Sequence, residues 1–306
     1  MNILITGATG FIGEYLTQSL TQKGHKVIIS TRSAEKAKKI FGQKVEIFDW
    51  DYKDVKKLTA LINQVDIIIN LAGENIAGGL WTKSQKKKIL ESRIKTGKII
   101  SQAIKQAQNK PKQLIQASAI GYYGFNPGNK CDENSEQGEG FLAHVCKQWE
   151  ESASEVSNQH VKRAIIRTGV VLGNTGGMLP KLVQPIKFFL GADLGKGDNY
   201  ISWIHIEDEI RAIEFIIENS LEGIFNLTAP EPVSSKELNK QIGVALKKPV
   251  WLKVPTFLLN ILLGDLSKEV LLANQEVFPS NLTNAGFNFK YSNISEAIKS
   301  LIKKSR

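Results

Sequence analysis

Residues 2–13 read Asn2-Ile3-Leu4-Ile5-Thr6-Gly7-Ala8-Thr9-Gly10-Phe11-Ile12-Gly13, an apolar run that leads into glycines spaced three apart. The run predicts a strand, and the residues after Gly10 predict a helix. Gly7 has no Cβ and can make the turn, Gly10 lets the backbone approach a pyrophosphate, and Gly13 lets the helix lie close to the strand. The N-terminus of that helix would point its N–H groups at phosphates. We therefore predict a dinucleotide-binding site that includes Thr9, Phe11 and Ile12, with an ordinary glycine turn as the alternative.

The segment Lys26–Ser33 predicts a second strand and its exit, where the two common dinucleotides are distinguished. An acidic residue at this exit accepts hydrogen bonds from the ribose 2′-OH of NAD, whereas an arginine accommodates the 2′-phosphate of NADP. This chain has Thr31 and Arg32 there, and no Asp or Glu until Glu35. We therefore expect NADP(H) as the cofactor, with a solvated arginine as the alternative interpretation of Arg32.

The composition is that of an enzyme-sized α/β protein. With 306 residues, of which 42% are hydrophobic, the chain can bury a full core, and we expect one large α/β unit with a smaller lobe. Cys131 and Cys146 stand in no C-x-x-C or Cys/His motif, so we expect neither a disulfide framework nor a metal site, and a cytoplasmic location. With the first strand at residue 2 we expect no signal peptide. The longest apolar run, Phe257–Leu263, is too short to span a bilayer.

The formal net charge of +10 has two possible explanations: an anionic binding partner, or a lysine-rich surface exposed to solvent. A nucleic-acid-binding protein would combine such charge with aromatic residues or a known binding motif, and the sequence shows neither. A lysine-rich solvated surface is the better interpretation, and a basic cleft would favour an anionic cofactor or substrate. We expect a small-molecule substrate, and neither a nucleic acid nor a membrane as a partner.

Strand and helix patterns alternate through the first half of the chain. This alternation predicts a Rossmann-type α/β fold with a doubly wound parallel sheet and right-handed crossovers. We assign residues 1–172 to the cofactor domain, with 202–225 returning to it, and residues 173–201 and 226–306 to a smaller, mainly helical substrate lobe. The further predicted strands are Val45–Asp49, Asp66–Leu71, Gln113–Ser118 and Arg163–Arg167, and the helices between them are Asp54–Gln64, Ser84–Gln108 and Phe141–Ser157.

A set of short motifs, in this order and spacing, resembles one protein family. They are Thr6–Gly13, Asn70–Ile76, Trp81-Thr82 with Ser92-Arg93, Ser118–Gly124, Phe141-Leu142-Ala143 with Trp149-Glu150, Arg167–Gly173, Ser202–Ile206, and Gly286-Phe287 near Tyr291. Through them nearly the whole chain resembles the atypical extended short-chain dehydrogenase/reductases of the epimerase-like subfamily, which has its own C-terminal domain. Members are variously labelled sugar-nucleotide epimerases, NADP-dependent oxidoreductases or cell-division-inhibitor-like proteins, so the resemblance implies the fold more narrowly than the reaction.

Further cofactor contacts follow from the predicted strand ends and from the resemblance. The strand Asp66–Leu71 should end beside the glycine turn, so the backbone of Leu71-Ala72-Gly73 and the adjoining Glu74 can pass along the dinucleotide. The resemblance implies that Asp49 places a carboxylate near the adenine amine. Arg93 lies in the Ser92-Arg93 motif and could reach a cofactor phosphate as a planar fork, the alternative being an ion pair with an acidic neighbour.

The expected catalytic pair of the family is missing. Extended members use a tyrosine, a lysine four residues later, and a Ser or Thr that holds the substrate oxygen. Matching Glu150 to the family glutamate places Leu142 at the tyrosine and Cys146 at the lysine, and neither side chain can replace them. Matching Tyr123-Gly124 to the family motif places Ala119 at the Ser or Thr, with Ser118 one residue early.

Three interpretations stay open. The protein is an NADP(H)-dependent oxidoreductase or sugar-nucleotide epimerase-like enzyme that takes its proton from another group or from water, or a catalytically silent NADP-binding protein, or a division-linked regulator. We select Ser118, Tyr122 and His205 as candidate catalytic residues. Each has a plainer explanation, such as a satisfied core histidine for His205.

Overall fold

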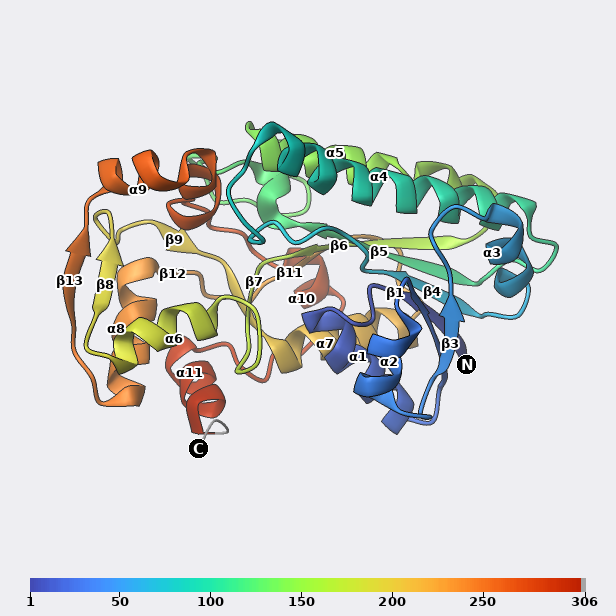
Figure 1. Cartoon of the computed structure of the whole chain (residues 1–306), viewed down its shortest axis with the longest axis horizontal. Coiled ribbons are helices and arrows are strands. Elements are labelled where there is room, and N and C mark those ends of the chain that lie inside the picture. Colours follow the sequence, from blue (N-terminus) through green and yellow to red (C-terminus); the bar gives the residue numbers. More distant parts are fainter. Residues whose placement is uncertain (304–306) are drawn as a thin grey trace.

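The computed structural model describes residues 1–303. Its centre is a seven-stranded, fully parallel sheet in the order β11-β6-β5-β4-β1-β2-β3 (Figure 1). The strands are β1 (Asn2–Thr6), β2 (Lys26–Thr31), β3 (Glu46–Asp49), β4 (Ile67–Asn70), β5 (Gln113–Ala119), β6 (Lys162–Thr168) and β11 (Gly223–Leu227). The order reverses at β1, where β2 and β4 lie on either side. This confirms the predicted Rossmann-type sheet, and a reversal of this kind is where ligands bind in open α/β sheets.

Helices cover both faces of the sheet (Figure 1). One face carries α1 (Phe11–Gln22), α2 (Ala34–Phe41) and α7 (Ile206–Glu218), and the other carries α3 (Val55–Ile62), α4 (Lys83–Gln106) and α5 (Phe141–Glu151). Successive side chains of a strand point to opposite faces of the sheet, so alternate residues pack into the two helix layers. In β1, Ile3 and Ile5 pack into the α1 and α7 layer, while Leu4 packs into the α3 and α4 layer.

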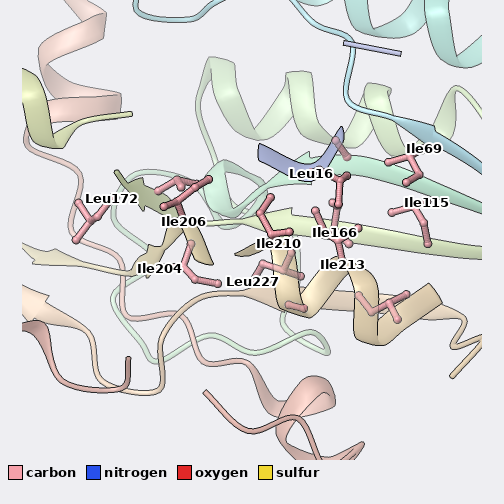
Figure 2. Close-up of a cluster of buried hydrophobic side chains, with 14 of the residues drawn as sticks. Leu16, Ile69, Ile115, Ile166, Leu172, Ile204, Ile206, Ile210, Ile213 and Leu227 are labelled. Atoms are coloured by element: carbon pink, nitrogen blue, oxygen red, sulfur yellow. The ribbon is translucent and has the colours of Figure 1, made fainter. Parts of the chain in front are cut away.

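The layer between the sheet and the helices α1 and α7 is the larger part of the core. Figure 2 shows branched aliphatic side chains of the strands meeting those of α1 and α7. These side chains are almost fully excluded from water, and they pack α1 and α7 against the sheet. They are Leu16, Ile69, Ile115, Ile166, Ile210 and Ile213.

The C-terminal lobe combines helices with short strand pairs. Its helices are α6 (Leu179–Lys187), α8 (Ser235–Leu246), α9 (Thr256–Leu263), α10 (Ser280–Asn284) and α11 (Ile294–Lys303). The pairs are β7 (Val170–Leu172) with β10 (Trp203–His205), β8 (Gly191–Leu194) with β13 (Val250–Val254), and β9 (Tyr200–Ile201) with β12 (Val233–Ser234). Strand β8 pairs with β13, a partner more than fifty residues away in the sequence. Within residues 1–303, no helix is both long and apolar enough to cross a bilayer.

Candidate functional site

A pocket of about 610 Å³ lies at the carboxyl ends of β1, β2 and β4. Nine of the fourteen predicted cofactor residues line it: Gly7, Thr9, Gly10, Thr31, Arg32, Leu71, Ala72, Gly73 and Glu74. The other five, Phe11, Ile12, Gly13, Asp49 and Arg93, do not. Nine further residues that were not among the predicted cofactor residues also line it: Ser30, Ser33, Lys36, Asp51, Tyr52, Lys53, Ser92, Lys95 and Thr96.

The turn after β1 is locked against the exit of β4. Gly7 has φ +75°, and a Cβ built on it would lie 2.7 Å from the backbone carbon and oxygen of Leu71, so only glycine fits. The Oγ1 of Thr6 donates to the Oδ1 of Asn70 (2.7 Å), and the same oxygen accepts from the backbone N–H of Ala72 (3.3 Å). One buried amide therefore fixes both loops at the base of the pocket.

The N-terminus of α1 faces this pocket without a capping side chain. Gly10 occupies the N-cap, and its N–H donates to the carbonyl of Gly7 (3.0 Å). Gly13 packs on the turn so tightly that a Cβ there would lie 2.3 Å from the oxygen of Gly7. The ring of Phe11 turns away to support loop 173–177, where a Cβ on Gly176 would come within 2.4 Å of it. Ile12 packs against the core. The first turn thus offers backbone N–H groups and a positive dipole end to an anion.

The exit of β2 forms the basic end of the pocket. Arg32 is exposed and lines the pocket with Ser33 and Lys36. Ser33 is the N-cap of α2 and accepts the N–H of Lys36 (3.4 Å), so a second helix N-terminus points to the same place. The hydroxyl of Thr31 accepts the N–H of Ser33 (3.1 Å), which fixes the bend of the loop. This end therefore presents hydroxyl, cationic and helix-dipole groups suited to a phosphate.

The loop after β3 supplies a side wall of the pocket. Asp49 is exposed and lies outside the pocket, where its carbonyl accepts the Nζ of Lys57 (2.7 Å). Asp51, Tyr52 and Lys53 line the pocket instead. Tyr52 has φ +64° and donates its hydroxyl to the carbonyl of Ser30 (3.3 Å); burial raises the pKa of Tyr52.

The opposite wall is the loop after β4, held from behind by α4. The N–H of Glu74 donates to the Oγ of Ser92 (3.0 Å). Arg93 is not in the pocket: its Nη1 donates to the carbonyls of Glu74 (3.0 Å) and Ile89 (2.9 Å), and its guanidinium carbon lies 4.8 Å from the centre of the Trp149 ring. Arg93 thus clamps the loop through its backbone instead of facing the cavity.

Ser118 belongs to a buried hydrogen-bond network beside the sheet. Its Oγ donates to the Oε1 of Glu150 (2.6 Å), and Glu150 accepts two hydrogen bonds of 2.9 Å from the guanidinium of Arg167. Arg167 also donates to the hydroxyl of Tyr123 (3.0 Å), which donates to the Oδ1 of Asn226 (2.8 Å). Burial raises the pKa of Tyr123 to about 12. The network joins β5, α5, β6 and β11, and it engages the hydroxyl of Ser118 as a donor.

The other two catalytic candidates differ from each other. His205 is buried at the N-cap of α7, where its Nδ1 accepts the N–H of Glu207 (3.0 Å) and its Nε2 meets the Oγ of Ser300 (3.0 Å). Its ring stacks on Tyr291 at 3.9 Å, and it does not line the pocket. Tyr122 is half-buried with its ring 3.4 Å from the guanidinium carbon of Arg167. Its hydroxyl makes no hydrogen bond to any group within residues 1–303.

Helix α5 presents apolar and thiol groups toward the 3₁₀ turn Ile120–Tyr123. A Cβ built on Gly121 would lie 3.2 Å from the Cβ of Leu142 and 3.6 Å from the Sγ of Cys146. Burial raises the pKa of Cys146 to about 11, so the thiol stays protonated at neutral pH. The backbone N–H groups of Phe141 and Leu142 donate to the carboxylate of Glu269 (3.0 and 2.8 Å). Glu269 comes from the C-terminal part, and no local sequence signal links it to α5.

Comparison with known proteins gives a family for the whole architecture. Residues 3–228 match the NAD dependent epimerase/dehydratase family, and residues 254–301 match a domain of unknown function, DUF1731. The chain is 36% identical over 304 residues to the Epimerase family protein YfhF of Bacillus subtilis, which covers 99% of this chain and 98% of that protein. It is 38% identical over 312 residues to the chloroplastic Epimerase family protein SDR39U1 homolog of Arabidopsis thaliana, covering 99% and 87%.

Solved structures agree with these matches. The crystal structure of human epimerase family protein SDR39U1 (isoform 2) with NADPH superposes with a TM-score of 0.88 at 28% identity, over 99% of both chains. UDP-glucose 4-epimerase of Thermotoga maritima, solved with UDP-glucose, superposes with a TM-score of 0.81 over 99% and 98% of the chains; at 16% identity this likeness supports the fold alone. With a family match over most of its length and relatives above 30% identity, the chain belongs to the NAD-dependent epimerase/dehydratase family.

Proposed function

We propose that this protein is an NADP(H)-dependent oxidoreductase that acts on a small carbonyl compound, with nucleotide sugars as one candidate class. The observation that carries the proposal is the pocket at the glycine turn, whose end at the exit of β2 is formed by Arg32, Ser33 and Lys36. A 2′-phosphate placed there would meet a planar guanidinium, an ammonium and a helix N-terminus. The NADPH in the human relative's structure supports the same cofactor for this chain.

The pocket fits a dinucleotide by its shape as well as its charge. The backbone at Gly7 and Gly10 leaves room that a larger side chain would take, and the first turn of α1 is free to bind the pyrophosphate. Tyr52 and the backbone of Leu71 to Gly73 would enclose the adenosine half. Bound NADPH supplies a hydride.

A proton donor is also needed, and the hydrogen bonds of the three candidate residues support one of them over the other two. Ser118 donates to Glu150, and His205 caps α7, so both are engaged in structural hydrogen bonds. Tyr122 keeps a free hydroxyl within residues 1–303, and the centre of its half-buried ring lies 3.4 Å from the guanidinium carbon of Arg167. We assign Tyr122 as the proton donor to the substrate oxygen.

Titration calorimetry with NADPH and NADH tests the cofactor. We expect NADPH to bind about 10- to 100-fold more tightly, because a charged hydrogen bond to the 2′-phosphate contributes roughly 1.5–3 kcal/mol. Arg32→Ala should abolish the difference, while Lys44→Ala, a lysine outside the pocket, should preserve it. Equal affinities for the two dinucleotides would refute the assignment of Arg32.

One feature favours a second candidate function, a cofactor-binding protein without turnover. Leu142 and Cys146 face the 3₁₀ turn where the family's tyrosine and lysine are expected, and Cys146 is a protonated thiol. NADPH oxidation against a panel of carbonyl compounds separates the two. Turnover that Tyr122→Phe removes supports the enzyme, and tight NADPH binding without turnover on a broad panel supports the silent protein.

A further inference from the structure

The strand β13 and the helix α9 lie at one end of the molecule (Figure 1), and together with the residues after α6 they expose an unusual amount of apolar surface. We define the β13–α9 surface as residues 187–190 and 247–263. Of the twelve large hydrophobic side chains exposed in the described chain, eight belong to it: Phe188, Phe189, Leu190, Trp251, Phe257, Leu258, Ile261 and Leu262. Such clustering marks an interaction site, since single exposed hydrophobic residues elsewhere are ordinary.

The segments of this surface are joined to one another. The indole N–H of Trp251 donates to the carbonyl of Phe189 (3.0 Å), and the Nζ of Lys248 lies 3.6 Å from the centre of the Phe189 ring. β13 continues through Pro255 into α9, whose residues are all apolar except Thr256 and Asn260. Of the side chains of α9, Leu259 alone is buried, while Phe257 and Ile261 are 65% and 75% exposed.

The charge of the surface has a single sign. Residues 187–190 and 247–263 contain four lysines, Lys187, Lys247, Lys248 and Lys253, and no Asp or Glu. Within the described residues, none of these lysines forms an ion pair. Beside the start of β13 a groove of about 490 Å³ is lined by Lys236, Lys240, Lys247 and Lys248, with Asp193 as its one acidic residue. Lys240 of the groove pairs with Glu237, whereas the four lysines of the surface form no ion pair within the described residues. An apolar area bordered by these lysines calls for a partner that is both apolar and anionic.

The sequence led us to expect no membrane as a partner, but the β13–α9 surface points the other way: we propose that it binds peripherally to an anionic lipid bilayer. The apolar side chains of α9 and Trp251 would enter the boundary between headgroups and acyl chains, while the lysines remain at the level of the lipid phosphates. Anionic headgroups complement the lysines and the neighbouring groove. A second copy of the chain would instead bring two lysine-rich surfaces together, and like charges oppose that contact.

The test uses the full-length protein and vesicles of defined composition. Flotation compares vesicles of phosphatidylcholine alone with vesicles that contain about one third phosphatidylglycerol. We expect binding to the anionic vesicles, weakened in about 0.5 M NaCl because salt screens the lysines. Trp251 is 66% exposed, so brominated lipid should quench the protein's fluorescence, and Trp251→Phe should remove most of that quenching.

Matched variants locate the binding surface. Phe257→Ser with Ile261→Ser should lower vesicle partitioning on the order of 100-fold, because two large apolar side chains no longer leave water. Lys187→Gln with Lys253→Gln should lower it about 25-fold at low salt, roughly five-fold for each lysine. The controls are Leu80→Ser, an exposed leucine elsewhere, and Lys44→Gln with Lys110→Gln, two exposed lysines outside the surface.

Three results would overturn the proposal. The first is the absence of binding to anionic vesicles. The second is binding that the control variants reduce as much as the surface variants do. The third is self-association in sedimentation runs without lipid that Phe257→Ser with Ile261→Ser abolishes, which would identify a second copy of the chain as the occupant. Binding that only the surface variants lose supports the bilayer.

Discussion

Glu209 should make the stability of this protein fall as the pH rises, and replacing it by Gln should remove that dependence. The carboxyl group lies on the inner side of α7 and is fully buried. Its Oε1 accepts the hydroxyl of Thr168 (2.8 Å), and its Oε2 has no hydrogen-bond partner within residues 1–303. Burial with so little compensation raises the pKa of Glu209 from 4.5 to about 8.

The sign and size follow from proton linkage. Below pH 4.5 the carboxyl is protonated in both the folded and the unfolded chain, so its full contribution to stability is present. As the pH rises toward 8 the unfolded chain releases the proton while the folded chain keeps it, and the free energy of unfolding falls. The two pKa values differ by about 3.5 units, and at about 1.4 kcal/mol per unit the loss approaches 5 kcal/mol.

Urea unfolding measured between about pH 5 and about pH 9 checks this prediction. Wild type should lose several kcal/mol more than Glu209→Gln over that range, so the variant becomes the more stable protein at the alkaline end. Glu222→Gln, which changes an exposed glutamate, should follow wild type. Parallel stability curves for wild type and Glu209→Gln would refute the reasoning, because they would mean that the carboxyl ionises equally easily in both states.

Three further predictions concern the site and its supports. Gly10→Val should abolish NADPH binding while circular dichroism still reports a folded protein, since the branched side chain would fill the space at the pyrophosphate; normal binding would mean that the dinucleotide lies elsewhere. Glu150→Gln should lower the free energy of unfolding by about 3–5 kcal/mol in urea, because it leaves the buried Arg167 cation without its carboxylate; a change within the error of an exposed control such as Glu151→Gln would contradict this. His205→Ala should cost about 0.5–2 kcal/mol of stability through the lost helix cap and leave NADPH affinity unchanged, and a large fall in affinity would return His205 to the cofactor site.

The parts of the fold that could be predicted are those encoded locally. The apolar run before Gly7 and the glycine spacing after it identify β1, the turn and α1, because backbone geometry at those positions depends on the residues themselves. The same reasoning placed Arg32 in the pocket, since strand periodicity locates the end of β2. The pairing of β8 with β13 could not be seen, because each is a short segment whose partner is distant in the sequence.

The loop after β3 shows how the residues that line a pocket depend on where a strand ends. Asp49 is paired with Thr31 at the end of the strand, and the chain must run on past it before it reaches the pocket with Asp51 and Tyr52. The available local signal was Asp54, which caps α3 by accepting the N–H of Lys57 (2.9 Å) and so marks where the loop ends. That cap shows that Asp51 and Tyr52 belong to the loop before α3. Strand ends are poorly determined by pattern alone, whereas a capping side chain fixes one residue.

The buried network around Arg167 determines which hydroxyl groups beside the sheet are engaged in hydrogen bonds and which one is free. Glu150 balances the Arg167 cation, so the hydroxyl of Ser118, which donates to the same carboxylate, can turn toward a substrate only by weakening that buried pair. Tyr123 is held in the same way between Arg167 and Asn226, and its raised pKa opposes ionisation. Tyr122 differs from both, because it touches Arg167 through its ring face and leaves its hydroxyl uncommitted within the described chain. The network therefore engages the hydroxyl groups of Ser118 and Tyr123, while that of Tyr122 stays free within residues 1–303 for the proton transfer that we propose.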